Sequence, residues 1–315
     1  MTDILSITGP IYLAIALGYT CTRFGWFTRA DMRVFGQFVI RLALPGLLFS
    51  AVASRDVADI LNASYLLAYL CGTLTVIGLG LWWGQRQQLA FTDNMVAVMG
   101  MSCSNSGYVG YPILLLTLAP VAAVSLALNM MVENLMVIPL LLVLAERGRG
   151  GGGHGLQVLR RTVLQLARNP LIISLGLGLL VALMRWRLPE PLSRSINLFA
   201  SASAGLSLFV IGGTLFGLPL DGMGRQIAPI VVAKLLLHPL AVALATVALP
   251  MVGLPALTPS LQLAAVMLAA MPMMGIYPIL AQSYNKENLG AAALLATTVV
   301  SFFSLSGLLW LTRTA

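Results

Sequence analysis

Long stretches without a charged residue constrain this chain more than any other feature of its sequence. The uncharged runs cover residues 4–22, 60–85, 94–132, 169–184, 195–220, 235–285 and 288–312. A helix needs about 20 mainly apolar residues to cross the hydrocarbon of a bilayer. Only 9% of the residues are charged, whereas a soluble domain carries roughly 25%. The sequence therefore predicts an all-α membrane protein.

The lengths of these runs predict how many times the chain crosses the membrane. The two longest runs each divide into two crossings, the first near Pro120 and the second between Pro250 and Pro259. Proline can open a helix because its missing N–H would be unpaired there anyway. Residues 34–53 add one more crossing despite Arg41. We therefore expect ten transmembrane helices.

A four-residue phrase occurs twice in apolar surroundings. Tyr-Pro-Ile-Leu stands at 111–114 and again at 277–280, which is 166 residues later. Each copy follows a glycine-bearing stretch that breaks a helix, at 105–110 and at 272–276. In a bilayer, the N–H and C=O groups freed by such a break must be satisfied by protein or by a water-filled cavity. Two matching breaks in a duplicated chain predict a shared binding site, as in a secondary transporter.

The same 166-residue offset indicates that the whole chain is duplicated. It aligns the predicted starts of further helices, pairing Ile4 with Pro170, Leu61 with Ile227 and Val121 with Glu287. Five helices per half is an odd number, so the second half must enter the membrane in the opposite sense. We expect a 5+5 inverted repeat, with halves at 1–146 and 169–315 and a cytoplasmic Gly/Arg linker at 147–168.

Basic residues predict the orientation of the chain, because Lys and Arg accumulate in cytoplasmic loops. Of the 18 Lys and Arg residues, Arg41 and Lys234 fall within spans, and five fall on one side, namely Arg55, Arg185, Arg187, Arg194 and Arg313. The other eleven fall on the opposite side, which is therefore expected to be cytoplasmic. Both termini then lie outside a plasma membrane, the inner membrane in a bacterium. The net charge of +8 is an orientation signal rather than a nucleic-acid-binding patch.

Groups that would serve catalysis or metal binding are scarce. The chain has 3 Cys and 2 His, far apart in the sequence, and it lacks the GxSxG and HExxH motifs of common hydrolases. We expect no enzyme activity, no catalytic residue, no metal site and no cofactor. An anion channel is a closer alternative, but two matched breaks fit a closed midplane site better than a continuous pore.

The two breaks supply the candidate substrate-binding residues. A broken helix exposes unpaired N–H groups and the positive end of its dipole, which together attract an anion. Glycine lets a backbone approach a ligand closely, although glycines can also serve helix packing alone. The candidates are Asn105, Ser106, Gly107 and Tyr108 in the first break, and Gly275, Ile276 and Tyr277 in the second. Asn105 offers an amide donor to a carboxylate, and the tyrosines could stack on an aromatic acid.

A polar face on the fifth predicted helix is the candidate for coupling substrate transport to the movement of an ion. Ser125, Asn129 and Glu133 recur every four residues and therefore share one face. An intramembrane carboxyl group is costly when ionised, so Glu133, with Asn129, is a candidate for proton coupling. Two alternatives stay open. The same oxygens could bind Na⁺, or Glu133 could neutralise Arg41 or Lys234.

Basic groups within the spans are candidate charge partners. Lys234 and His238 are four residues apart on the eighth predicted helix and face the same way. Lys234 could balance either the substrate or an acidic side chain, and His238 could either titrate or pack through a hydrogen bond. Arg41 could bind a second carboxylate or pair with an acid.

Several segments resemble the auxin efflux carrier family, which includes plant auxin carriers and bacterial permeases for small organic acids. The resemblance covers nearly the whole chain and is carried by residues 17–19, 42–49, 105–112, 206–212, 234–239 and 272–285. It implies that helices 1, 2, 6 and 7 form a scaffold and helices 3–5 and 8–10 a transport domain. It also implies that helices 4 and 9 cross at Pro112 and Pro278, with Asn105 at the substrate. Many bacterial members have an Asn where this chain has Met273, Met274 and Gly275.

The resemblance and the breaks together give the functional prediction. We expect a transporter or facilitator of small organic anions, either mono- or dicarboxylates or auxin-like acids, that works by alternating access. The alternatives are a sodium-coupled symporter of related fold and an anion channel. The predicted partners are the carboxylate substrate, the lipid bilayer and a second copy of the chain, without nucleic acid.

Overall fold

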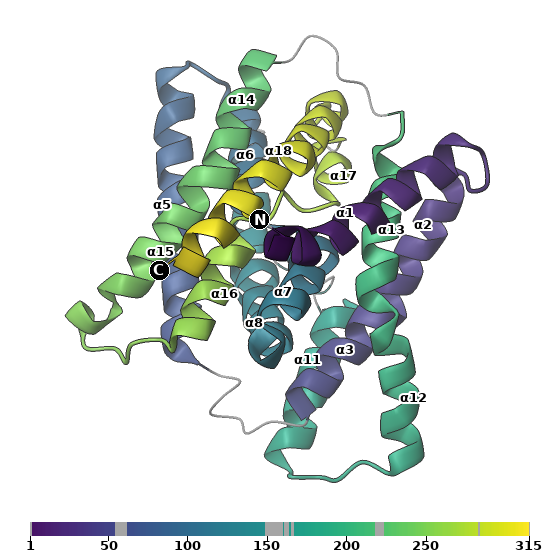
Figure 1. The fold of residues 1–315 in the computed structure, drawn as a ribbon. Helices are drawn as coiled ribbons and strands as arrows, with labels where there is room; N and C mark the ends of the chain where they lie inside the picture. Colours follow the sequence, from purple (N-terminus) through teal and green to yellow (C-terminus); the bar gives the residue numbers. More distant parts are fainter. Residues whose placement is uncertain are drawn as a thin grey trace. The chain divides into compact units, whose positions relative to one another are not determined.

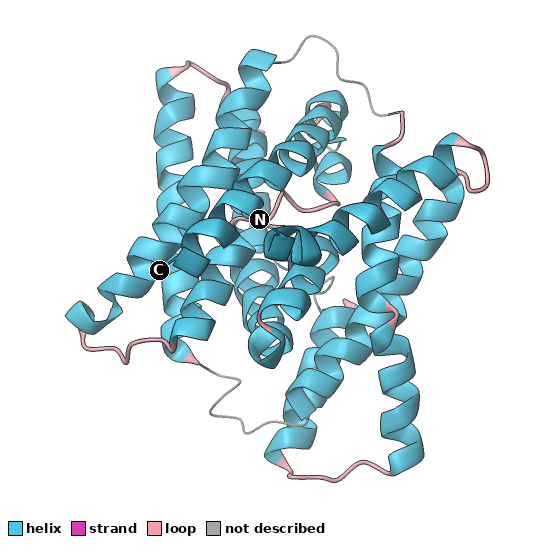
Figure 2. Ribbon diagram, in the orientation of Figure 1, coloured by secondary structure: helices cyan, strands magenta, loops and turns pink. Residues whose placement is uncertain are grey.

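The computed structural model describes residues 2–53, 62–148, 160, 164, 167–217, 224–282 and 284–314, and these residues form helices and connecting loops without a β-strand (Figure 2). Most of the predicted linker at 147–168, including 149–159, lies outside this range. Six helical segments of the described chain are long and apolar enough to cross a membrane: Arg29–Ala53, Ala63–Arg86, Ala119–Ala145, Glu190–Leu215, Gly224–Val252 and Asn288–Leu311. The all-α class is confirmed, with six candidate membrane spans in the described chain. The count of ten helices and the inverted repeat stay predictions.

The chain forms two compact units, and each is assembled from three separate stretches. The first unit contains residues 1–62, 106–128 and 167–217. The second unit contains residues 63–105, 129–166 and 218–315. The division falls between Asn105 and Ser106, so the first predicted break supplies residues to both units.

Helices of the first unit pack closely where glycine replaces a side chain. The unit contains α1 (Thr2–Arg23), α2 (Arg29–Phe38), η1 (Val39–Ala43), α3 (Leu44–Ala53), η2 (Ser106–Gly110), α7 (Tyr111–Thr117), most of α8 (Ala119–Val132), α11 (Pro170–Leu183), α12 (Glu190–Ser201) and α13 (Ser203–Leu215). α1 packs against α13 (Figure 1). A Cβ atom built on Gly18 would overlap the carbonyl oxygen of Phe209, and one on Gly212 would overlap that of Ile15. The two backbones are therefore in direct contact.

The second unit contains the broken and ionisable segments. Its helices are α5 (Ala63–Arg86), α6 (Phe91–Ser102), η3 (Glu133–Val137), α9 (Ile138–Gly148), α14 (Gly224–Val232), η4 (Ala233–Leu237), α15 (His238–Ala248), η5 (Leu249–Val252), α16 (Pro259–Ala269), α17 (Tyr277–Gln282) and α18 (Glu287–Thr314). α5 and α15 run side by side (Figure 1). A Cβ atom on Gly72 of α5 would lie 2.7 Å from the Cα of Val242 on α15, so this pair also depends on a missing side chain.

Four π-helical turns interrupt the α-helices, and each ends two residues before a proline. The turns η1, η2, η3 and η4 precede Pro45, Pro112, Pro139 and Pro239. Proline lacks an N–H, and its ring clashes with the carbonyl group four residues earlier. In all four cases that carbonyl lies inside the π-helical turn, so the wider turn removes the clash without ending the helix.

Local signals explain where several helices begin. The span predicted from residue 34 begins at Arg29, because Thr28 and Asp31 form a capping box at the start of α2. α8 begins at Ala119, next to Pro120, and α16 begins at Pro259 after Thr258, whose side chain caps the helix. The predicted divisions of the two longest runs are therefore confirmed.

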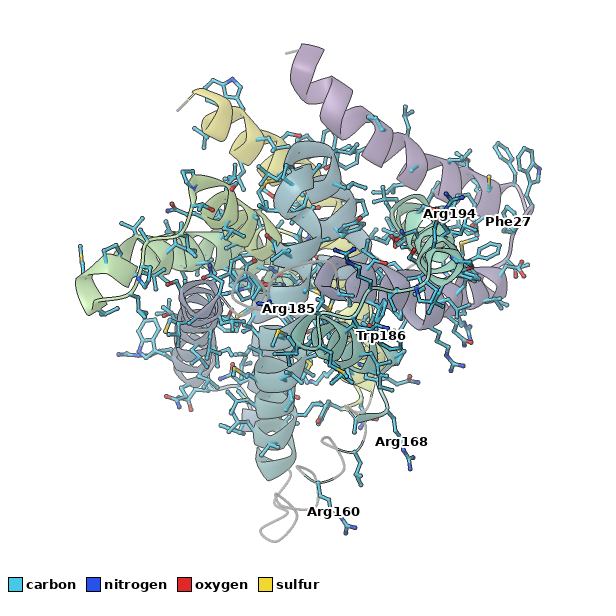
Figure 3. All side chains as sticks on the ribbon, turned by 90° about the horizontal axis from the view of Figure 1, so that it is seen from below. Phe27, Arg160, Arg168, Arg185, Trp186 and Arg194 are labelled. Carbon is cyan, nitrogen blue, oxygen red and sulfur yellow. The ribbon has the colours of Figure 1, made fainter. Side chains whose placement is uncertain are left out.

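The connection between α11 and α12 carries exposed basic and aromatic residues in the first unit. Arg185, Trp186 and Arg194 are labelled in Figure 3. Arg185 has φ of 50°, Trp186 is 60% exposed, and Arg194 pairs with Glu190 on the next helix. An amphipathic cavity of about 420 Å³ lies beside this connection, with Ser50 and Asn197 in its lining.

Candidate functional site

Two helices of the second unit are interrupted at or beside the predicted breaks. α6 ends at Ser102, and Cys103–Asn105 are not helical. α16 ends at Ala269, and the helix resumes only at Tyr277 as α17. The second interruption is present where it was predicted, whereas the first lies at 103–105 rather than at 105–110, because residues 106–110 form the π-helical turn η2.

The two interrupted segments are hydrogen-bonded to each other. The N–H of Asn105 donates to the carbonyl of Pro272 at 2.8 Å, and the N–H of Met274 donates to the carbonyl of Cys103 at 3.2 Å. Ser104 and Met273 thus form an isolated antiparallel bridge. This pairing satisfies backbone groups that the breaks would otherwise leave buried without partners.

A fully buried ammonium group lies against this bridge. Lys234, on η4, is 0% exposed. Its Nζ atom donates to Ser104 Oγ at 2.8 Å and to the carbonyl of Ala269 at 2.6 Å, and it lies 3.0 Å from His238 Nδ1. The prediction that Lys234 and His238 face the same way is confirmed. Three acceptors match the three N–H donors of the ammonium.

The carboxylate of Glu133 approaches the same bridge and is also buried. Its Oε1 atom accepts a hydrogen bond from the N–H of Ser104 at 3.0 Å and another from the hydroxyl of Tyr69 at 3.1 Å. The hydroxyl groups of Tyr69 and Ser104 are 3.3 Å apart. Ser104 therefore connects the acid on η3 with the base on η4.

His238 extends the network toward α5. Its Nε2 atom lies 3.0 Å from Thr73 Oγ1, and the Thr73 hydroxyl donates to the carbonyl of Tyr69 at 2.7 Å. The Tyr69 ring meets the His238 ring edge to face, with centroids 5.7 Å apart. Both nitrogens of the imidazole therefore have polar partners, and its ring packs against the Tyr69 ring.

The substrate-site residues predicted in the second unit differ in their exposure. Gly275 is exposed and Ile276 is 42% exposed. Asn105 is buried, with its amide nitrogen 3.6 Å from the place where a Cβ atom of Gly275 would lie. Within the described chain, the N–H groups of Gly275 and Ile276 make no hydrogen bond. These two donors and the Asn105 amide therefore lie close together.

Tyr277 has a packing role in this structure. Its side chain is 0% exposed, and its hydroxyl donates to the carbonyl of Val96 on α6 at 3.0 Å. The ring lies against Gly100, where a Cβ atom would approach it within 3.0 Å. The hydrogen bond holds α17 against α6.

Removing this bond gives a first test. We expect Tyr277→Phe to lower the free energy of unfolding by about 1–3 kcal/mol, because the buried Val96 carbonyl loses its donor. Thermal unfolding of the purified protein measures the effect. Tyr19→Phe, at a 36% exposed position, is the matched control, and an equal loss in both variants would contradict this role.

The remaining predicted substrate residues belong to the first unit. Ser106 and Gly107 are buried on η2, and the Tyr108 hydroxyl donates to the carbonyl of Gly36 at 2.9 Å. Pro112 lies on α7 in this unit, whereas Pro278 lies on α17 in the second. Their predicted crossing stays a prediction.

The other predicted polar residues within spans are mainly buried. Ser125 and Asn129 on α8 are both 0% exposed, and the adjoining Glu133 is 3% exposed. Arg41, on η1 of the first unit, is exposed. No group of three or more His, Cys, Asp or Glu side chains in the described part of the chain is placed to hold a metal ion.

The sequence prediction missed Ser104, Tyr69 and Thr73. Tyr65, Tyr69 and Thr73 recur every four residues in an otherwise apolar span, and all three are buried. This is the same polar periodicity that identified Glu133, so it could have identified α5. Ser104 gave a weaker signal, because in the sequence only its position beside Asn105 drew attention to it.

Comparisons with known proteins agree with a membrane protein of this kind. The family described as "Membrane transport protein" matches residues 7–309. A protein from Rhizobium meliloti (strain 1021) named "Putative malonate transporter" is 32% identical over 318 residues, which cover 99% of this chain and 97% of the relative. A protein from Escherichia coli (strain K12) named "Uncharacterized transporter YfdV" is 26% identical over 304 residues, which cover 93% and 92%.

Proposed function

Because the chain belongs to the membrane transport protein family, which matches residues 7–309, we propose that it is a secondary transporter of small organic anions that works by alternating access. The family match confirms the resemblance to the auxin efflux carriers, and it indicates a multi-pass membrane transporter rather than an enzyme. The proposal includes the ten-helix inverted repeat, the crossing at Pro112 and Pro278, a bacterial inner-membrane location and both termini outside.

The observation that carries the anion assignment is the group of N–H donors at the second break. Gly275 and Ile276 are exposed residues, and their backbone N–H groups make no hydrogen bond within the described chain. The Asn105 amide lies beside them. Successive backbone N–H groups bind anions, and a carboxylate has two oxygens that can accept from them. Ser106, Gly107 and Tyr108, which directly follow Asn105 in the sequence, are also proposed as substrate residues.

Malonate is the first substrate to test. The relative from Rhizobium meliloti is named for malonate and is similar over 99% of this chain. Malonate carries two carboxylates on one carbon, so a single small site can engage both. An aromatic acid would need a flat apolar surface, and the buried Tyr277 ring does not offer one.

Replacing the site asparagine tests this proposal. We expect Asn105→Ala to raise the malonate concentration for half-maximal uptake about 10-fold to 100-fold, because a hydrogen bond to a charged group is worth about 1.5–3 kcal/mol. Uptake of radiolabelled malonate into proteoliposomes measures the effect, and thermal shift measures binding directly.

Asn134→Ala is the matched control for this experiment. The Asn134 side chain bonds within its own helix, to the carbonyl of Met130 at 3.0 Å, so we expect nearly unchanged uptake. Saturable uptake of malonate that Asn105→Ala leaves unaltered would remove Asn105 from the site. No binding of any carboxylate by the wild-type protein would overturn the anion assignment.

Coupling is proposed to involve Glu133 and Asn129, with the proton as the coupling ion. The support is the burial of Glu133 beside the first break. Malonate uptake driven by an inward proton gradient in the absence of Na⁺ is the expected result. Uptake that needs a Na⁺ gradient would favour the sodium-coupled alternative, and unsaturable conductance would favour a channel.

A further inference from the structure

Hydrogen-bond chemistry fixes the positions of the protons in the buried network. An ammonium group donates and cannot accept, so Lys234 donates to His238 Nδ1 across their 3.0 Å contact. The imidazole is therefore neutral, and its proton lies on Nε2, where it is donated to Thr73 Oγ1. His238 thus serves as an acceptor for the ammonium and does not carry charge in this arrangement.

The same reasoning gives a direction to the contacts that lead to the acid. The Tyr69 hydroxyl has one proton, which it donates to Glu133 Oε1. Its oxygen must then accept from Ser104 across 3.3 Å. Ser104 Oγ in turn accepts from Lys234 at 2.8 Å. A continuous donor-to-acceptor path therefore runs from the ammonium through two hydroxyl groups to the carboxylate.

We propose that Ser104 and Tyr69 form a proton relay between Lys234 and Glu133, and that this relay is the coupling element of the transport site. Each hydroxyl accepts a proton on its oxygen from one neighbour as it passes its own proton to the next. One passage along the path neutralises both ends. Lys234 becomes an amine, Glu133 becomes a carboxylic acid, and both hydroxyl groups keep one proton each.

The inference deepens the proposed function, because the network can change its charge next to the proposed anion site. With Lys234 protonated and Glu133 ionised, the pair has no net charge. After the relay has moved a proton from Lys234 to Glu133, uptake of one proton from solution by the Lys234 amine restores the ammonium and gives a net charge of +1. Ser104 directly precedes Asn105; its hydroxyl accepts a hydrogen bond from the ammonium, and its N–H donates one to the carboxylate. One added proton can therefore balance one carboxylate charge of the substrate.

Titratable groups face the relay from α5, the first break, η4 and α15. Tyr65 and Tyr69 approach Glu133 from α5, and Cys103 approaches it from the first break. Lys234 and His238 contribute from η4 and α15. Lys234 is the basic side chain that reaches Ser104, and Glu133 is the acidic one. The relay therefore has one base and one acid as its ends.

The test measures proton movement and substrate movement together. Wild-type protein in proteoliposomes, with a pH-sensitive dye inside and radiolabelled malonate outside, should move protons with substrate in a fixed ratio. Ser104→Ala should still show a thermal shift with malonate but lose the coupled proton movement. Ser104→Thr, which restores a hydroxyl, should recover the ratio at least in part. Tyr69→Phe should lose the coupled movement as Ser104→Ala does.

Ser102→Ala is the matched control, because the Ser102 hydroxyl is buried two residues away and donates to the carbonyl of Val98 in its own helix. It should keep the wild-type ratio of protons to malonate. A wild-type ratio in Ser104→Ala, or saturable malonate uptake without proton movement in the wild type, would overturn the relay and leave the anion transporter standing. Absence of any carboxylate binding by the wild type would overturn both.

Discussion

Lys234→Met is expected to lower the free energy of unfolding by about 3–5 kcal/mol and to abolish substrate-coupled proton movement. Lys234 and Glu133 are buried opposite charges joined through Ser104, and removing one of them leaves the other uncompensated in a medium that solvates it poorly. The ammonium also satisfies Ser104, the Ala269 carbonyl and His238, so the substitution leaves three acceptors without their donor. Thermal or denaturant unfolding in detergent measures the loss.

The double variant Lys234→Met/Glu133→Gln identifies the cause of this loss. Glutamine keeps an oxygen that can accept from Tyr69 and from the Ser104 N–H, but it removes the charge. We expect the double variant to be more stable than the sum of the two single losses predicts, because neither charge remains unpaired. Strictly additive losses would show that the two groups do not interact through Ser104.

A partly exposed ion pair in the same unit provides the control. Lys286 lies 2.9 Å from Asp93, and their side chains are 36% and 39% exposed. Partly exposed pairs contribute at most about 1 kcal/mol. We therefore expect Lys286→Met to change stability by less than about 1 kcal/mol.

Gly212→Ala is expected to destabilise the first unit by about 3 kcal/mol or more. The added methyl group would overlap the carbonyl oxygen of Ile15. Flexible side chains can move away from an added group, but a backbone carbonyl in a hydrogen-bonded helix cannot, so the cost lies at the upper end of the range for overpacking. Expression level and unfolding temperature in detergent report the effect.

Two further variants make the test specific to contact between α1 and α13. Gly205→Ala lies on the same helix in open space, and it should be neutral or slightly stabilising because alanine favours a helix. Gly18→Ala would overlap the carbonyl of Phe209 and should behave like Gly212→Ala. If the double variant loses no more than either single one, the helices have already separated after the first substitution.

Much of the fold could be predicted because membrane helices have simple requirements. The uncharged runs located the apolar spans, and Pro120 and Pro259 marked helix starts that the structure contains. The two breaks were predictable because glycine and proline stand together in apolar sequence. The assembly of each compact unit from three separate stretches does not follow from a single sequence, because it depends on which helix faces meet.

The candidate site was predictable only in part. Lys234, His238 and Glu133 stood out because ionisable residues are rare in spans. Serine and tyrosine are common in spans, so Ser104 and Tyr69 gave little signal until their distances were known. The burial of Tyr277 was also hidden, since a repeated motif does not tell which side of a helix its tyrosine occupies.

The π-helical turns before Pro139 and Pro239 have a consequence for protein engineering. A π-helical turn holds one extra residue, which rotates the chain before it by about 100° relative to a continuous α-helix. Glu133 and Lys234 lie in these turns, so their direction depends on an imino acid several positions away. A redesigned chain that keeps the acid and the base but replaces either proline would allow the ordinary helical register to return. The acid and the base would then be present, but their side chains would point in a different direction.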